Sequence, residues 1–158
     1  MRYTFVKQHD ATDCAAACLA MICLHYKKET TITKLRDIMG TDLKGTNLIG
    51  LTKCAETLGF NSQAVRVDRE GFLSDFTLPC IANVITKEGL SHFVVVFKKI
   101  KTKKQDYVII GDPAKELLKI TVDDFYKDFT GTILILKPNT NFTQGKNEKG
   151  KVFSRFLK

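Results

Sequence analysis

One of the five cysteines in this chain has the surroundings of a nucleophile. Cys14 follows the polar stretch QHDATD and opens the apolar stretch CAAACLAMICL, so we predict that it lies at the first turn of a helix. A thiol attacks a carbonyl carbon only as the thiolate, and a helix N-terminus favours that anion. Taken alone, Cys14 fits either a core residue or a nucleophile. The remaining cysteines lie among apolar residues and are interpreted as small buried side chains: Cys18, Cys23, Cys54 and Cys80.

A cysteine nucleophile needs a base that takes its proton, and the base needs a third group that orients it. His25 would lie about 16 Å from Cys14 along the same predicted helix, which is too far. His9 lies on the loop before that helix and has no evident orienting partner, so a surface histidine is the simpler interpretation. His92 is the best candidate for the base, with Asp112 as the residue that orients it.

The pairing of His92 with Asp112 depends on the register of a predicted hairpin. The strands HFVVVFKKI and DYVIIGD flank a basic turn, and if Ile100 lies opposite Lys104, then His92 lies opposite Asp112. Directly opposed residues have Cβ atoms about 5 Å apart on one face of a sheet. A shift of one residue would place them on opposite faces. We therefore expect a histidine and an aspartate to meet at the rim of a sheet.

Attack on an amide also creates an oxyanion, which needs hydrogen-bond donors already in place. The backbone N–H of Cys14, at a helix start, is one such donor. Gln8, six residues upstream on the entering loop, could place its side-chain amide over the same point. Gln8 alone would be an ordinary surface residue, and it becomes a candidate for the oxyanion hole only as part of this set.

The elements that must position these residues are helices first and strands later. Asp13 is expected to cap a helix from Cys14 to about Tyr26. Two further helices are expected, one from Thr33 to Gly40 and one from Asn47 to a stop at Gly59. Another, capped by Thr121, is expected over about 122–129. Strands are predicted at SQAVRV, PCIANVI, HFVVVFKKI, DYVIIGD and GTILILK.

This order predicts an α+β domain in which a helical N-terminal half packs on a C-terminal, mostly antiparallel β-sheet. Both faces of the central hairpin are apolar, so the sheet is expected to be covered on both sides. At 158 residues the chain is of single-domain size. Its longest uncharged apolar run has eleven residues, short of the roughly 18 needed to span a bilayer, and it lacks the flanks of a signal peptide.

Composition excludes several classes of site. Five cysteines without a CxxC pair indicate free thiols in a reducing compartment, and we expect a chain that faces the cytosol. No metal site is expected, because Cys14 and Cys18 share a helix face but the nearest in-line imidazole, His25, lies about 10 Å beyond Cys18. No cofactor motif is found. The net charge of +8 is not interleaved with stacking aromatic residues, which argues against a nucleic-acid partner.

Four segments, QHDATDCAAACLAMI, SHFVVVF, IIGDPA and FYKDFTGTILIL, together resemble a known family over about residues 7–136. The family is the N-terminal cysteine peptidase domain of peptidase-containing ABC transporters, the double-glycine leader peptidases that process and export bacteriocins, lantibiotics and quorum peptides. The resemblance implies a papain-like fold. It also implies that Cys14 is the nucleophile, His92 the general base and acid, Asp112 the orienting aspartate and Gln8 the oxyanion glutamine.

The resemblance further implies hydrolysis after a Gly-Gly or Gly-Ala pair that ends a leader peptide, with the leader docked as an amphipathic helix in an apolar groove. Partners would be the transmembrane and ATP-binding domains of a parent transporter, at the cytoplasmic side of a bacterial cell membrane. Residues 1–137 would be the peptidase domain, and 138–158 a basic linker toward a missing transmembrane region. Within it, 138–151 is polar and expected to be loose, and VFSRFLK is either the start of an interfacial helix or a disordered stub.

Two residues or runs depart from the family pattern. Ala15 stands where many members have glycine after the nucleophile, and the run KELL stands where many have a glycine after the DPA segment. The second change could reshape the rim beside Asp112. Two other functions stay open: a non-catalytic domain that only docks the leader, and a papain-like acyl transferase that passes the acyl group to an amine.

Overall fold

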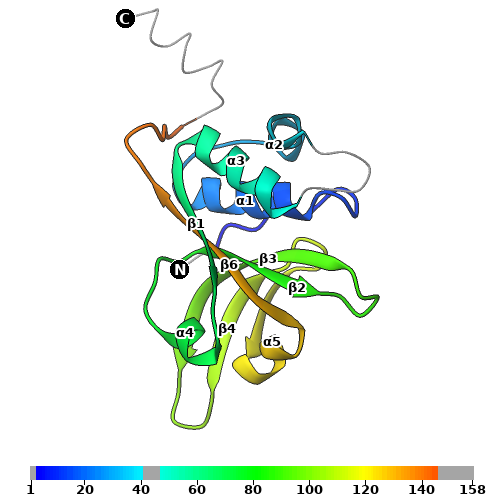
Figure 1. Cartoon of the computed structure of the whole chain (residues 1–158), viewed down its shortest axis with the longest axis vertical. Coiled ribbons are helices and arrows are strands. Elements are labelled where there is room, and N and C mark those ends of the chain that lie inside the picture. Colours follow the sequence, from blue (N-terminus) through cyan, green and yellow to red (C-terminus); the bar gives the residue numbers. More distant parts are fainter. Residues whose placement is uncertain (1–2, 41–46, 146–158) are drawn as a thin grey trace, which may run out of the picture.

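The computed structural model describes residues 3–40 and 47–145, which form one β-sheet with helices on both of its faces (Figure 1). The predicted α+β class is confirmed. The elements in chain order are α1 (Cys14–His25), α2 (Ile32–Met39), α3 (Leu48–Leu58), β1 (Phe60–Arg66), α4 (Arg69–Leu73), β2 (Cys80–Ile85), β3 (Ser91–Lys101), β4 (Asp106–Gly111), β5 (Leu117–Thr121), α5 (Val122–Asp128) and β6 (Phe129–Pro138).

The six strands lie in the order β1-β6-β2-β3-β4-β5, and every neighbouring pair is antiparallel, as predicted. The sheet separates two apolar cores. On one face Phe93, Val95 and Phe97 of β3 pack with α1, α2 and α3. On the other face Val94 and Val96 pack with α4 and α5. This alternation confirms that the central hairpin is covered on both sides.

Helix α1 is buried on all sides, because every residue of Cys14–Cys23 is apolar and most are small. It lies against β3 (Figure 1), and its Met21 reaches Gly111 at the end of β4. A Cβ atom at Gly111 would lie 2.8 Å from both Met21 Sδ and a ring atom of Phe97, so this approach requires glycine there. Since Gly111 ends β4, the close packing brings the helix to the edge of the sheet where that strand stops.

The caps of the helices agree only in part with the predicted ones. Asn47 Oδ1 accepts a hydrogen bond from Gly50 N at 2.9 Å, and Gly59 ends α3 with a φ of 101°, both as expected. Helix α2, however, is capped by Thr31 rather than Thr33, because Ile32 is buried and already forms part of the helix. Asp13 stands at the cap position of α1, but its side chain makes no capping hydrogen bond within the described part of the chain, so the predicted cap is wrong.

Two short elements were not predicted. Helix α4 has five residues and is capped by Asp68, whose side chain accepts a hydrogen bond from Gly71 N at 2.7 Å. Strand β5 pairs with β4 along its whole length and contains part of the KELL run that departs from the family pattern. Neither alternation nor a helical period marks LLKIT, so its strand conformation depends on the neighbouring strand.

The register of β3 with β4 differs from the predicted one. Val96 pairs with Ile110 and not with the predicted Val108, a displacement of two residues. Between Val96 and Lys98 a bulge adds one residue, so that the displacement is three on the side of the turn. The prediction that His92 and Asp112 lie directly opposite each other is therefore wrong. Because side chains alternate with a period of two, the displacement of two residues near the rim keeps both of them on one face.

The chain after β6 remains attached to the helical half as far as Gly145. Lys28 is buried, its Nζ donates a hydrogen bond to Thr143 O at 3.1 Å, and its backbone forms a β-bridge with Gly145. The expectation of a loose segment from Pro138 onward is therefore wrong for the part that ends at Gly145. Residues 146–158, which include VFSRFLK, lie outside the described residues. Within residues 3–40 and 47–145, no helix has the length and apolar character that crossing a membrane requires.

Candidate active site

His92 and Asp112 form a hydrogen-bonded pair at the rim of the sheet, where β3 begins and β4 has just ended. His92 Nε2 lies 2.8 Å from Asp112 Oδ1, and the two side chains are only 10% and 14% exposed. The same Oδ1 atom accepts a hydrogen bond from Ala114 N at 3.0 Å, which fixes the carboxylate. The structure thus brings together the two residues that the hairpin was expected to pair.

The two groups shift each other's protonation. Burial lowers the pKa of His92, but hydrogen bonds with Asp112 and Cys14, and the charges of these two partners, outweigh burial and raise that pKa to about 9. Burial raises the pKa of Asp112, while the His92 hydrogen bond and the Ala114 N–H lower it by more, so that the pKa lies below its ordinary value. At neutral pH the pair is therefore an imidazolium and a carboxylate.

Cys14 begins α1 close to the ring of His92, and its proximity is one cause of the raised pKa of His92. Since Nε2 is bound to Asp112, Nδ1 is the ring nitrogen that remains for the thiol. In space, the thiol of Cys14, the imidazole of His92 and the carboxylate of Asp112 thus follow one another in the order that nucleophilic catalysis by a thiol requires.

The other four cysteines lie in a different environment. All are buried and none is bridged to another cysteine in the described part of the chain. Burial raises the pKa of Cys18 well above its ordinary value, and it raises the pKa of Cys23, Cys54 and Cys80 to about 12. These thiols remain protonated at neutral pH and serve as apolar core residues, as the sequence predicts.

Gln8 lies beside the histidine–aspartate pair, on the loop that leads to α1. Its backbone N donates a hydrogen bond to Pro113 O at 2.8 Å, which ties the loop to the residue after Asp112. The Oε1 atom of Gln8 is buried and has no hydrogen-bond partner among the described residues. This oxygen can only accept a hydrogen bond, so its partner would be water or an N–H group of a ligand.

A cleft of about 460 Å³ opens over this pair, and Gln8, His92 and Asp112 line it. The turn between β2 and β3 forms another wall and contributes Ile85 and Leu90, which are apolar and largely exposed. These two residues were not predicted as part of the site. Their only signal is that two apolar side chains flank the polar turn sequence TKEG, and this pattern is common in hairpins that bind nothing.

The remaining candidate histidines do not join the site. His25 is the last residue of α1 and packs edge-on against Tyr26, with 4.8 Å between ring centroids. His9 is exposed on the entering loop. Within the part of the chain that the structure describes, no group of three or more histidine, cysteine, aspartate or glutamate side chains could hold a metal ion.

The chain is similar to known processing proteins. The lactococcin-G-processing and transport ATP-binding protein LagD of Lactococcus lactis subsp. lactis is 41% identical over 138 residues, which are 87% of this chain and 19% of that protein. The transport/processing ATP-binding protein ComA of Streptococcus pneumoniae is 32% identical over 148 residues, 93% of this chain and 20% of that protein. The chain thus spans about a fifth of the length of these relatives.

Two solved structures have the same fold. The peptidase domain of Streptococcus ComA, a bifunctional ABC transporter involved in quorum sensing, aligns with a TM-score of 0.80 and 31% identity, covering 87% of this chain and all of that one. A double glycine motif protease from an AMS/PCAT transporter, solved in complex with the leader peptide, aligns with a TM-score of 0.77 and 33% identity, covering 87% and 93%. The predicted papain-like fold is thereby confirmed. A model of the peptidase C39 family matches residues 2–141, and the chain belongs to that family as a cysteine peptidase domain.

Proposed function

We propose that this domain removes the leader peptide from a secreted peptide precursor by cleaving after a Gly-Gly or Gly-Ala pair, as part of an ABC transporter that exports the product. The observation that carries the proposal is the buried His92–Asp112 pair in contact with the thiol at the start of α1. Similarity to processing and transport proteins, and to a double glycine motif protease bound to its leader peptide, supports the choice of substrate.

In this mechanism, Cys14 and His92 act as a thiolate–imidazolium pair, and Asp112 holds the ring through Nε2. The thiolate attacks the carbonyl carbon of the second small residue, and His92 then gives its proton to the leaving amine. Water releases the acyl group, so that the leader ends in a free carboxylate. Gln8 and the Cys14 backbone N–H are the proposed donors to the oxyanion.

The leader helix has a suitable docking surface next to the cleft. A groove of about 560 Å³ shares Val84, Asp112 and Lys115 with the cleft and continues across the sheet face toward α5. Its floor is apolar, and charged side chains lie at its border. An amphipathic helix can place its apolar face in such a groove and its polar face in water. The apolar lining residues are Val84, Val94, Ile110, Leu118, Ile120 and Phe125.

The wider assembly follows from the same proposal. Residues 1–137 form the peptidase domain, and 138–158 connect it toward the transmembrane and ATP-binding domains of the parent transporter, on the cytoplasmic side of the membrane. The contacts of Lys28 with Thr143 and Gly145 attach the first part of this connection, as far as residue 145, to the helical half near the end of α1.

Mass spectrometry of a synthetic double-glycine leader peptide tests the function. Wild type should release the leader with a free carboxylate after the second small residue, and Cys14→Ala should release none. Cys54→Ala removes a thiol from α3, away from the site, and should cleave at a rate within a few fold of wild type. If wild type binds the leader without cleaving it, the chain is a docking module. If an adduct with an added amine forms instead, it is an acyl transferase.

The oxyanion role of Gln8 has its own test. Gln8→Ala should lower kcat by about 10²-fold with little change in KM, because a donor to the oxyanion acts in the transition state and not on the bound substrate. If kcat/KM falls by the same factor because KM rises while kcat is unchanged, Gln8 binds the leader and does not stabilise the oxyanion.

A further inference from the structure

Gln8 is attached to the sheet side of the site through the turn that follows β4. Its backbone N donates a hydrogen bond to Pro113 O at 2.8 Å. Pro113 is buried and is the second residue of the turn 112–116, which joins β4 to β5. The carbonyl that holds Gln8 therefore belongs to the residue directly after Asp112, the partner of the histidine.

This turn is closed by hydrogen bonds of its own. Asp112 N donates to Glu116 O at 3.1 Å, and Lys115 N donates to Asp112 O at 2.9 Å. The Asp112 side chain closes the turn further, since its Oδ1 accepts a hydrogen bond from Ala114 N at 3.0 Å. Pro113 lies between these contacts, and its ring fixes its φ at about −65°. The turn therefore determines the direction of the Pro113 carbonyl.

One oxygen atom thus serves two parts of the site. Asp112 Oδ1 lies 2.8 Å from His92 Nε2 and also accepts the Ala114 N–H. Through the first contact the carboxylate orients the ring. Through the second contact it shapes the turn that presents Pro113 O to Gln8. The base and the proposed oxyanion donor are accordingly held by the same turn.

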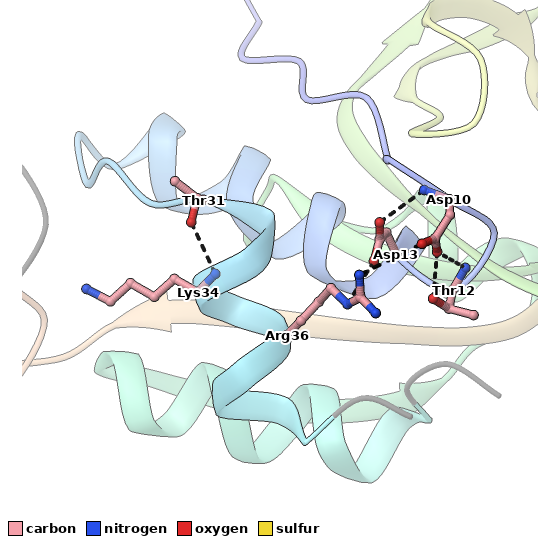
Figure 2. A network of polar contacts seen from close by, with 6 residues as sticks. All are labelled: Asp10, Thr12, Asp13, Thr31, Lys34 and Arg36. Atoms are coloured by element: carbon pink, nitrogen blue, oxygen red, sulfur yellow. Dashed lines mark hydrogen bonds and ion pairs between the residues drawn. The ribbon is translucent and has the colours of Figure 1, made fainter. Parts of the chain in front are cut away.

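The rest of the loop that carries Gln8 is fixed from the helical side. Figure 2 shows Asp10, Thr12 and Asp13 hydrogen-bonded to one another, and the Arg36 side chain reaching from α2 to Asp13. These contacts begin two residues after Gln8 and hold the part of the loop that adjoins α1. At Gln8 itself, the hydrogen bond to the turn after β4 attaches the loop to the sheet.

We propose that Pro113 is a positioning residue for catalysis, whose carbonyl holds Gln8 where the Gln8 side chain can donate to the oxyanion. The inference rests on the proposed peptidase function and on the oxyanion role of Gln8, and it deepens both. An oxyanion donor must be in place before the charge develops, and a displacement of about 1 Å can cost as much as about 10²-fold in rate. Pro113→Gly keeps the carbonyl but releases φ, so that the carbonyl is no longer held in one direction.

The test compares kcat and KM for a double-glycine leader peptide in wild type, Pro113→Gly, Gln8→Ala and the double variant. Pro113→Gly should lower kcat about tenfold at unchanged KM, because the oxyanion donor acts in the transition state. In the Gln8→Ala background the same substitution should change kcat by less than about twofold, since the side chain that it displaces is already gone. Pro138→Gly, at the exposed end of β6, is the matched control for the loss of a proline and should stay within about twofold of wild type.

A second measurement separates this role from an effect on the neighbouring Asp112. Alkylation of Cys14 by iodoacetamide depends on the thiol and the imidazole beside it and not on an oxyanion donor, so Pro113→Gly should react as fast as wild type. Slower alkylation, or a loss of kcat that persists in the Gln8→Ala background, would show that the substitution acts through His92 and Asp112, and would overturn the proposal.

The remaining outcomes separate this proposal from the function. If wild type does not cleave, the peptidase function fails and the role of Pro113 falls with it. If wild type cleaves and either Pro113→Gly or Gln8→Ala equals it, the positioning role is overturned while the function stands. Should Pro113→Gly not fold by circular dichroism, Pro113→Ala and its double with Gln8→Ala replace it, with the same pattern of rates expected.

Discussion

The two sides of the proposed site are held in place by different kinds of contact. On the sheet side, backbone pairing of β3 with β4 carries His92 and Asp112 to the rim. On the helical side, Cys14 is placed by the apolar packing of α1 against the sheet, and the loop before it is bound to α2 by the buried Asp13 and its partner Arg36. The sheet side therefore depends on register, and the helical side depends on core packing together with single polar contacts.

This difference determines what each side tolerates. A register change of two residues leaves the faces of a strand unchanged, so the sheet side tolerates an even displacement and not an odd one. The helical side has no such periodicity, and the loss of one charge leaves a buried carboxylate next to the nucleophile without its ion-pair partner. Variants that shift the register and variants that remove one side chain should therefore differ in effect.

Removing the imidazole should have the largest effect. His92→Ala takes away both the base and the proton donor, so we expect kcat to fall by at least about 10³-fold, as for the loss of a triad member. Leader-peptide cleavage measured by chromatography checks this. Replacing His25 by alanine, at the far end of α1, should leave the rate within a few fold of wild type. Comparable losses in the two variants would remove His92 from the mechanism.

An odd insertion should break the sheet side. One alanine placed between Gly111 and Asp112 moves the carboxylate to the next position of the strand and away from His92, and a misplacement of this kind costs about 10²-fold in rate. One alanine placed between Lys103 and Lys104, in the exposed turn of the same hairpin, should cost less than about threefold, because it lies at the far end of the strands. Equal losses would mean that register does not position the pair.

The His92–Asp112 pair should also make stability depend on pH. The pKa of His92 in the folded protein is about 9, above its ordinary 6.5, so the protonated ring stabilises the fold fully below pH 6.5. That contribution is lost as pH rises through about 9. Chemical denaturation should show a free energy of unfolding that falls over this window in wild type, relative to His92→Gln. A constant difference between the two proteins across the window would contradict the raised pKa.

The smallest expected effect concerns the helix that carries Arg36. Thr31 Oγ1 accepts a hydrogen bond from Lys34 N at 3.1 Å and caps α2. Thr31→Ala should therefore destabilise the protein by about 1 kcal/mol. Thr33→Ala is the matched control, because Thr33 lies inside the helix and makes no cap. Thermal unfolding of the two variants decides which threonine caps; a larger loss from Thr33→Ala would reverse the assignment.

Local signals in the sequence were sufficient where a single residue decides the geometry. Asn47 and Gly59 bound α3 as predicted, since a cap and a left-handed stop are properties of a few neighbouring residues. The cap of α2 was predicted at Thr33 but lies at Thr31. The choice between them depends on the burial of Ile32, which is a property of the tertiary packing.

Features that depend on distant neighbours could not be predicted. The bulge between Val96 and Lys98 leaves no mark in an apolar strand. Because of it, the register is displaced from the predicted one by three residues at Lys98 but by two at Val96, and the even displacement at the rim keeps His92 on the face of Asp112. The strand conformation of LLKIT comes from pairing with β4. The contact of Asp13 with Arg36 joins residues from different helices, and the sequence offered only a common cap residue, which was interpreted as a cap.

The rate of alkylation of Cys14 by iodoacetamide at pH 6, located by peptide mass mapping, tests the central claim most directly. In wild type the thiolate–imidazolium pair should make Cys14 react at least about tenfold faster than a free thiol at that pH. In His92→Gln the advantage should disappear. If Cys14 reacts at the rate of a free thiol, or reacts equally fast with and without His92, then the thiol and the imidazole do not act as a pair.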